Sequence, residues 1–289
     1  MTDDVTAVVG VSDDGGSSGR LRREFDVVPP GDLRMALAAL CGDDTWGRTW
    51  SRVVQHRFAG SGELAGHSVG NLLITAVWEE TEDIVTGLDW VAALLGAHGR
   101  VLPVATSPLE VVADVAGLHP EDLTIVEQVR GQVEVATTRG EVLRLHLEPA
   151  DVRACPQALE AIREADAVVL GPGSWFTSVL APLQVPGVAE AVIEGPGRVV
   201  VILNLDAQQG ETSGFSPHRH LQVLAQQVPD LRVDTVLADP ARVHDVAALA
   251  AEAAALGARL VMAPVSARDG SPRHDVDLLA SALGGVLAG

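Results

Sequence analysis

Two hydrophobic patterns alternate along the chain, one typical of buried strands and one typical of helices. Nearly continuous apolar runs indicate strands covered on both faces of a parallel sheet. They are Thr6–Ser12, Arg100–Thr106, Asp166–Gly173, Arg198–Asp206, Arg232–Asp239 and Arg259–Ser266. Helical patterns between and after them cover Asp32–Leu40, Ser68–Glu80, Gln157–Ala165, Ala241–Ala258 and Asp275–Leu287. This order of strand, loop, helix and strand predicts an open, doubly wound α/β fold with a mostly parallel sheet.

One segment departs from this order. Residues Leu123–Pro149 alternate with a period of two, and breaks fall at Arg130-Gly131 and Thr137–Gly140. This pattern indicates a small antiparallel β insertion rather than another βα unit. The sequence shows no repeat and no linker, so residues 1–289 are predicted to form a single α/β domain.

Composition narrows the function classes. With 289 residues, 47% of them hydrophobic, the chain can bury a sizeable core. A formal net charge of -19 argues against general binding to nucleic acid or to anionic membranes. All 20 basic residues are arginines, which excludes a Schiff-base lysine and a P-loop lysine. The first residues show no signal-peptide pattern, and no uncharged stretch is long enough to span a bilayer. We therefore expect a cytoplasmic protein without membrane insertion.

Polar residues follow the first apolar run directly. Asp13 and Asp14 are succeeded by a flexible loop, Gly15, Gly16, Ser17, Ser18 and Gly19. Such a loop at a strand end can present main-chain N–H groups to an anion. Two carboxylates beside a phosphate make sense if Mg²⁺ bridges them to it, or if one binds a hydroxyl group. A solvated acidic turn is an equally good interpretation of the spacing.

Other candidate residues lie at further strand and helix ends. Gly173 and Ser174, with Thr177 and Ser178 in the next turn, would offer a helix start to a phosphate, although an ordinary tight turn has the same pattern. Asn204 ends the fourth apolar run. His67 and Asn71 begin a helix, where a histidine is more often structural than catalytic.

Histidines and tryptophans give weaker signals. The spacing of His218 and His220 suits a metal pair on a strand, but the surrounding pattern favours a helix start. Four tryptophans at helical positions are predicted to lie in the core. Trp175 is instead predicted to lie in a loop beside the candidate phosphate site at Gly173 and Ser174. The four are Trp46, Trp50, Trp78 and Trp90.

Six motifs in order carry a resemblance that covers essentially the whole chain. They read SDDGGSSGRLR, PPGDLR, GHSVGNL, VLGPGSWFTSVL, QQGET and RHDVDLLA. The chain resembles the YvcK or gluconeogenesis-factor family, within the superfamily that includes the 2-phospho-L-lactate transferase CofD. The resemblance implies a three-layer, Rossmann-like fold with a nucleotide-type pocket at the strand ends.

The resemblance also implies a function. YvcK-like proteins bind UDP-sugars such as UDP-N-acetylglucosamine and are linked to gluconeogenic growth, peptidoglycan synthesis and cell shape. The expected protein is therefore a UDP-sugar-binding regulator of central carbon flux, and a homodimer. The alternative is a metal-dependent, CofD-type transferase of a phospholactyl-like group from a nucleotide diphosphate substrate. Neither reading identifies a catalytic residue, and whether the chain catalyses a reaction stays open.

Residue roles follow from the motifs that match. Asp13 and Asp14 correspond to the acidic pair, the expected contact for Mg²⁺ or for a polar ligand group. Gly15–Gly19, Gly173, Ser174, Thr177 and Ser178 correspond to loops that should face the diphosphate. The remaining pocket motifs contribute Asp32, Arg34, His67, Asn71 and Asn204.

The chain differs from the family in two respects. It reads WFTS and AQQGET where the family is expected to read LYTS and TQPGET, although the polar residues of these motifs are kept. The other difference lies at the start of the chain. Family members usually carry a strand and a GGGTG-type glycine loop ahead of the acidic pair. Only twelve residues precede Asp13 here, without such a loop. We therefore expect a central strand and part of the phosphate cradle to be absent, which would leave two strand edges uncovered.

Overall fold

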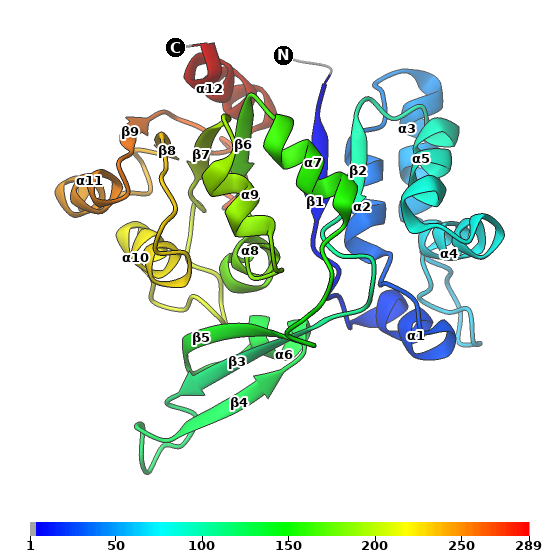
Figure 1. Cartoon of the computed structure of the whole chain (residues 1–289), viewed down its shortest axis with the longest axis horizontal. Helices are drawn as coiled ribbons and strands as arrows, with labels where there is room; N and C mark the ends of the chain where they lie inside the picture. Colours follow the sequence, from blue (N-terminus) through cyan, green and yellow to red (C-terminus); the bar gives the residue numbers. More distant parts are fainter. Residues whose placement is uncertain (1–3, 289) are drawn as a thin grey trace.

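The computed structural model describes residues 4–288 and confirms an α/β fold with mostly parallel strands (Figure 1). β1 (Thr6–Val9) pairs in parallel with β2 (Arg100–Pro103). A second parallel sheet has the order β6-β7-β8-β9. Its strands are β6 (Ala167–Leu170), β7 (Arg198–Ile202), β8 (Thr235–Ala238) and β9 (Arg259–Met262). Each of the six strands lies within an apolar run predicted from the sequence.

The antiparallel insertion is also confirmed, but it begins earlier than predicted. β3 (Glu110–Ala116) lies between β4 (Val126–Arg130) and β5 (Glu141–Glu148). Residues that alternate like a strand form a short helix instead, α6 (Gln132–Ala136). Gly131 adopts a φ of 92° just before this helix, which turns the chain out of the sheet.

Five helices lie between β1 and β2, of which α1, α3 and α5 are absent from the sequence prediction. They are α1 (Gly16–Phe25), α2 (Gly31–Ala39), α3 (Thr45–Gln55), α4 (Val69–Thr81) and α5 (Ile84–Leu95). The carboxylates of Asp44 and Asp83 accept hydrogen bonds from the first turns of α3 and α5. Gly96, with a φ of 63°, ends α5 in the left-handed conformation. Local capping therefore marks the starts of two helices that the sequence prediction lacks.

The second half of the chain alternates helices with β6–β9. Pro156 begins α7 at a position where its missing N–H costs nothing. A π-helical turn, η1, directly follows the loop after β6 and runs into α8. The elements are α7 (Pro156–Glu164), η1 (Trp175–Leu180), α8 (Ala181–Leu183), α9 (Val188–Glu194), α10 (Pro217–Gln227), α11 (Val246–Ala255) and α12 (Val276–Ala288).

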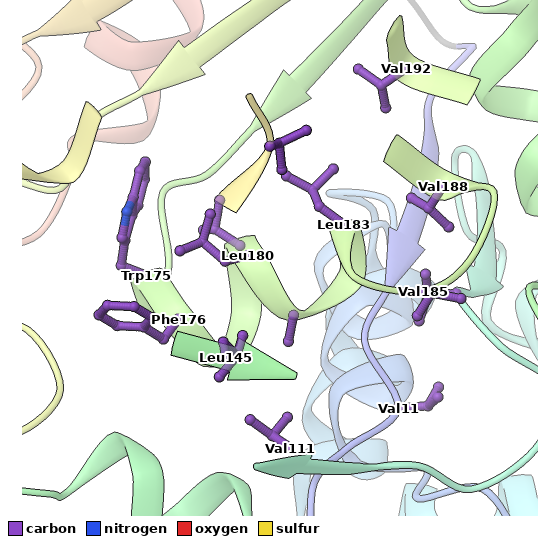
Figure 2. Close-up of a cluster of buried hydrophobic side chains, with 14 of the residues drawn as sticks. Val11, Val111, Leu145, Trp175, Phe176, Leu180, Leu183, Val185, Val188 and Val192 are labelled. Atoms are coloured by element: carbon purple, nitrogen blue, oxygen red, sulfur yellow. The ribbon is translucent and has the colours of Figure 1, made fainter. Parts of the chain in front are cut away.

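The largest buried side chains lie where η1 and α8 meet the other parts of the fold (Figure 2). Trp175 and Phe176 at the start of η1 are fully buried. Val111 of β3 and Leu145 of β5 belong to the same cluster, as does Val11 after β1. Loss of a buried aromatic side chain typically costs about 3–5 kcal/mol. The start of η1 is therefore packed in the core between the parallel strands and the antiparallel insertion.

Three of the tryptophan predictions need correction. Trp175 does not lie in an open loop but is 0% exposed in the core. Trp46 and Trp90, predicted as core residues, are 54% and 65% exposed, whereas Trp78 is buried as predicted. Trp46 lies on the outer side of α3, where its indole N–H donates to the carbonyl of Leu94 on α5. The helical positions of Trp46 and Trp90 therefore did not indicate which face of α3 and α5 is buried.

Within residues 4–288, the two parallel sheets have four edge strands, β1, β2, β6 and β9. Of these, β1 pairs with β2 and β6 pairs with β7. Both β1 and β6 are only partly buried, and Val169 of β6 is 39% exposed. In Figure 1, α7 lies beside β6 and crosses in front of β1. The expected absence of a central strand stays a prediction.

Within residues 4–288, no single helix has the length and apolar character needed to cross a membrane. The bent pair Trp175–Leu183 and Val188–Glu194 meets that test only when its two helices are taken together.

Candidate functional site

The acidic turn after β1 is folded over the starts of two helices. Asp13 accepts a hydrogen bond from the N–H of Gly15 at 3.0 Å. Its other carboxylate oxygen and the hydroxyl of Ser18 lie where a β-carbon on Gly31 would be, at the first residue of α2. A side chain at position 31 would therefore displace both groups. The starts of α1 and α2 meet at the Asp13 carboxylate.

Asp14 contacts a different part of the fold. Its carboxylate accepts a hydrogen bond from the N–H of Val133 at 3.2 Å, in the first turn of α6. Its second oxygen lies against Gly131. The neighbouring Ser12 hydroxyl donates to the side-chain carbonyl of Gln132. The two adjacent carboxylates of the sequence motif are therefore engaged by separate elements.

Asp32 is the carboxylate that lies near Asp13. Burial, followed by the negative charge of Asp13, raises the pKa of Asp32 to about 6. The side chain of Gln132 opposes this shift by a hydrogen bond. Gln132 thus contacts both the acidic turn and α2, and no sequence motif had pointed to it.

Arg34 is a buried cation in the same region. Arg34 is 5% exposed, and its Nε donates a hydrogen bond to the side-chain carbonyl of Asn71 at 2.9 Å. Asn71 in turn donates to the Ser18 hydroxyl at 3.2 Å. Within residues 4–288, no carboxylate lies within ion-pair distance of Arg34, and its terminal nitrogens have no hydrogen-bond acceptor. Burial, and then the charge of Arg57, lower the pKa of Arg34.

His67 has a structural contact. Its Nδ1 lies 3.0 Å from the Ser17 hydroxyl, which also accepts the N–H of Ser68 at 3.3 Å. Burial, and then the charge of Arg20, lower the pKa of His67, so the neutral ring is favoured. This contact joins the start of α1 to the start of α4. The geometry agrees with the structural interpretation of the histidine.

The loop after β6 is closed by its own contacts. Asn204, which follows β7, accepts the N–H of Gly173 at 3.1 Å and donates to the carbonyl of Gly173 at 2.8 Å. Gln208 donates to the Ser174 hydroxyl at 3.3 Å. Thr177 is buried and Ser178 is exposed. Gly173, Ser174 and Asn204 are therefore close together, and their role toward a diphosphate stays a prediction.

A buried carboxylate occupies the start of η1. Glu211 is 2% exposed and accepts the N–H of Phe176 at 3.1 Å. Burial raises the pKa of Glu211 against the effect of this hydrogen bond. An N–H group predicted to face a phosphate is thus already engaged within the chain. The QQGET motif contains Glu211, but the motif alone did not indicate this contact.

The short helix α6 lies between the two groups of site residues. Its first turn contacts Asp14, and the carbonyl of Ala136 at its last residue accepts the N–H of Glu211 at 3.2 Å. Gly210, with a φ of 107°, packs directly against the same carbonyl. The predicted residues therefore form two clusters, one at Asp13, Asp32 and Arg34 and one at Gly173 and Asn204, at opposite ends of α6.

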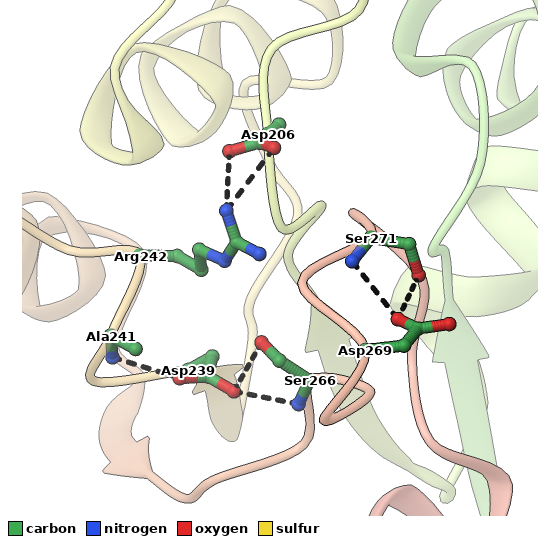
Figure 3. Close-up of polar contacts among 7 residues, drawn as sticks. All are labelled: Asp206, Asp239, Ala241, Arg242, Ser266, Asp269 and Ser271. Atoms are coloured by element: carbon green, nitrogen blue, oxygen red, sulfur yellow. Dashed lines mark hydrogen bonds and ion pairs between the residues drawn. The ribbon is translucent and has the colours of Figure 1, made fainter.

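The ends of β7, β8 and β9 are held by acidic side chains (Figure 3). Asp239 accepts hydrogen bonds from the N–H groups of Ala241, Val265 and Ser266 and from the Ser266 hydroxyl, at 2.6–2.8 Å. Burial alone would raise the pKa of Asp239, but these hydrogen bonds together lower it. Asp206 forms an ion pair with Arg242 at 3.3 Å. The contacts of Asp239 and Asp206 therefore stabilise the loops that follow these strands.

A metal bound only by side chains does not fit this site. Residues 4–288 contain no group of three His, Cys, Asp or Glu side chains placed to hold a metal ion. His218 bonds to Ser216 and His220 is buried in α10, so these two do not form a pair. Mg²⁺ often binds through one or two carboxylates and completes its shell with phosphate oxygens and water. Asp13 and Asp32 fit that mode, whereas Asp14 faces α6.

Comparison with known proteins shows the family to which the chain belongs. A family model described as 2-phospho-L-lactate transferase CofD matches residues 1–263. The chain belongs to the CofD family. It is 51% identical over 291 residues to a protein of Mycobacterium tuberculosis named "Putative gluconeogenesis factor", covering 100% of this chain and 84% of the relative. It is 36% identical over 242 residues to the "Gluconeogenesis factor" of Bacillus subtilis, covering 84% of this chain and 73% of the relative.

A solved structure supports the same assignment. A UPF0052-family protein of Bacillus halodurans superimposes with a TM-score of 0.85 at 32% identity. The match covers 99% of this chain and 91% of that protein. The arrangement of sheets is therefore shared with an experimentally determined UPF0052-family protein.

Proposed function

We propose that this CofD-family chain is a cytoplasmic gluconeogenesis factor that binds a UDP-sugar of the UDP-N-acetylglucosamine type. In this role it would regulate central carbon flux, peptidoglycan synthesis and cell shape, as a homodimer. The naming of its relatives supports the general assignment. The ligand class rests on the site at Asp13, Asp32 and Arg34.

The observation that carries the proposal is Arg34, a residue that is only 5% exposed and whose terminal guanidinium nitrogens have no acceptor among the described residues. Removing a charge from water is unfavourable by several kcal/mol unless an opposite charge compensates it. Arg34 has no carboxylate within ion-pair distance in the described part of the chain, and its terminal nitrogens lack acceptors. A guanidinium matches the oxygens of a phosphate with paired N–H groups. A diphosphate at Arg34 would supply the missing anion.

The start of α1 supports the same placement. Ser18, in the first turn of α1, is linked to Arg34 through Asn71. Gly15 precedes the helix and makes no side-chain cap, so the first N–H groups of this ten-residue helix keep their capacity for an anion. The helix start and the guanidinium therefore converge on one place.

Mg²⁺ belongs to the proposal as a ligand-dependent ion. Asp13 and Asp32 would hold it, and the phosphate oxygens would complete its coordination. When bound, the ion would neutralise the charge between the phosphates and the two carboxylates. It would also offset the negative charge of Asp13, which contributes to the raised pKa of Asp32.

Titration calorimetry tests the proposal directly. The whole chain should bind UDP-N-acetylglucosamine at one site per chain, more tightly with Mg²⁺ than with EDTA. Arg34→Gln should abolish this heat, whereas Arg268→Gln, on an exposed loop, should not. Absence of binding to UDP-N-acetylglucosamine and to other UDP-sugars by the folded parent chain would refute the ligand class.

The family model also supports a second candidate, a metal-dependent transfer reaction of the CofD type. Phosphorus NMR separates the candidates. Metal-dependent consumption of a phospholactyl-linked nucleotide diphosphate by the parent chain supports a transferase. Stable binding of a UDP-sugar without any change of its phosphorus signals supports the regulator.

A further inference from the structure

A cavity lies at the far end of α6 from the acidic turn. Its volume is about 450 Å³, and it opens between the start of β5, the loop after β7 and the start of α10. Arg139 and Glu141 line one side, and Glu211, Phe215, His218 and Arg219 line the other. No sequence motif had assigned a ligand to it.

Two arginines and two glutamates line the cavity, and one arginine has no partner among the described residues. Arg139 makes no hydrogen bond or ion pair with any residue of the 4–288 range. Arg219 pairs with Glu141 at 3.2 Å and lies 5.8 Å from the ring centre of Phe215. Arg139 is thus a cation at the rim of a cavity, still able to bind an anion.

The start of α10 adds a donor to the same wall. Its N-cap residue, Ser216, makes no cap with its side chain, because the hydroxyl contacts His218 instead at 3.0 Å. Pro217 opens this helix of 11 residues. Pro217 has no N–H and the N–H of Arg219 donates to the carbonyl of Ser216 at 3.0 Å, so the N–H of His218 is the donor that this positive helix end offers to an anion.

A buried polar group gives an independent indication. Glu211 is 2% exposed, lines the cavity and has one carboxyl oxygen without a hydrogen-bond partner in the described residues. A buried polar atom is normally paired with a protein group, with water or with a ligand. A ligand hydroxyl donating to this oxygen would satisfy it.

We propose that this cavity is a second small-molecule site, for the phosphate monoester of a polyhydroxylated compound such as a sugar phosphate. The phosphate would bind between Arg139 and the start of α10, and a hydroxyl would face Glu211. Phe215 is the one aromatic side chain of the lining and would cover an apolar face of the sugar. The cavity volume exceeds the needs of inorganic phosphate alone.

Calorimetry on the whole chain with glucose 6-phosphate tests this site. We expect saturable binding that weakens at least tenfold in Arg139→Gln and stays unchanged in Arg144→Gln. Arg144 is a matched control because it is an exposed arginine of β5 outside the cavity. Equal affinities for both variants would overturn the assignment. Affinity for inorganic phosphate or for glucose as high as for glucose 6-phosphate would overturn the ligand class.

Competition separates this site from the nucleotide-sugar site. Saturating UDP-N-acetylglucosamine should leave a stoichiometric glucose 6-phosphate site, and Arg34→Gln should retain it. Complete displacement by the UDP-sugar would show one shared site and overturn the proposal. If the parent chain binds glucose 6-phosphate but no UDP-sugar, the second site stands and the function proposed above fails.

Discussion

The carboxylate of Asp14 accepts the main-chain N–H of Val133 at 3.2 Å, although 119 positions separate the two residues in the sequence. This contact attaches the first turn of α6 to the acidic turn after β1. α6 in turn reaches Glu211 through the carbonyl of Ala136. The antiparallel insertion is therefore part of the site, because its one helix lies between the two clusters.

Replacing Asp14 by alanine should loosen α6. The variant loses an acceptor at a helix start, which typically costs about 1 kcal/mol. Hydrogen exchange of the amides in 132–136 should therefore become faster than in the parent chain, while Asp14→Asn should have a smaller effect. Asp151→Ala, at an exposed acid without a described contact, is the control. Unchanged exchange in Asp14→Ala would show that the contact does not hold the helix.

Arg34→Gln should separate binding from stability. If the guanidinium serves a ligand, its removal takes away a largely desolvated charge that the carboxylates of Asp32 and Asp13 offset only in part. The free energy of unfolding of the ligand-free chain should then stay within about 1 kcal/mol of the parent, or rise. Affinity for UDP-N-acetylglucosamine should fall at least tenfold, about 1.4 kcal/mol. A large loss of stability measured by urea unfolding would instead identify Arg34 as a structural residue.

Asp32 should make stability depend on pH. Its pKa is raised from 3.8 to about 6 in the folded chain, so the folded state binds more protons than the unfolded state between these values. The free energy of unfolding therefore falls as pH rises from about 4 to about 6 because of this group. Asp32→Asn removes that loss and keeps an acceptor for Gln132.

Urea unfolding at two pH values measures this effect. Asp32→Asn should exceed the parent by ~2 kcal/mol at pH 7.5 and match it near pH 4. Glu121→Gln, at an exposed carboxylate, corrects for the change in net charge. A difference that is the same at both pH values would contradict the assigned cause.

Much of the fold could be predicted because buried parallel strands leave continuous apolar runs. The motifs assigned Ser18, Arg34 and Asn71 to a ligand pocket, and the structure joins these three residues by hydrogen bonds. The contacts of Gln132 could not be predicted, since they depend on how the insertion folds back over the acidic turn. α6 was missed because Val133 and Val135 alternate like strand residues while tertiary contacts decide the helix.

The ionisation of Glu211 can be tested in the same way. Glu211 accepts the N–H of Phe176 at the start of η1 and also lines the cavity beside α10. Burial raises its pKa above the ordinary glutamate value, so stability should fall as pH rises through that raised pKa. Glu211→Gln keeps an oxygen for the N–H of Phe176 but carries no charge. It should therefore be more stable than the parent at pH 8, and the difference should vanish near pH 4.

Glu211→Ala is the matched comparison. It leaves the buried N–H of Phe176 without an acceptor, which typically costs about 1–3 kcal/mol at every pH. Urea unfolding of both variants at pH 4 and pH 8 distinguishes the two effects. If Glu211→Gln loses as much stability as Glu211→Ala at pH 8, the ionised carboxylate itself holds the start of η1. The neutral acceptor would then be insufficient, and the charge at this position would be stabilising despite its burial.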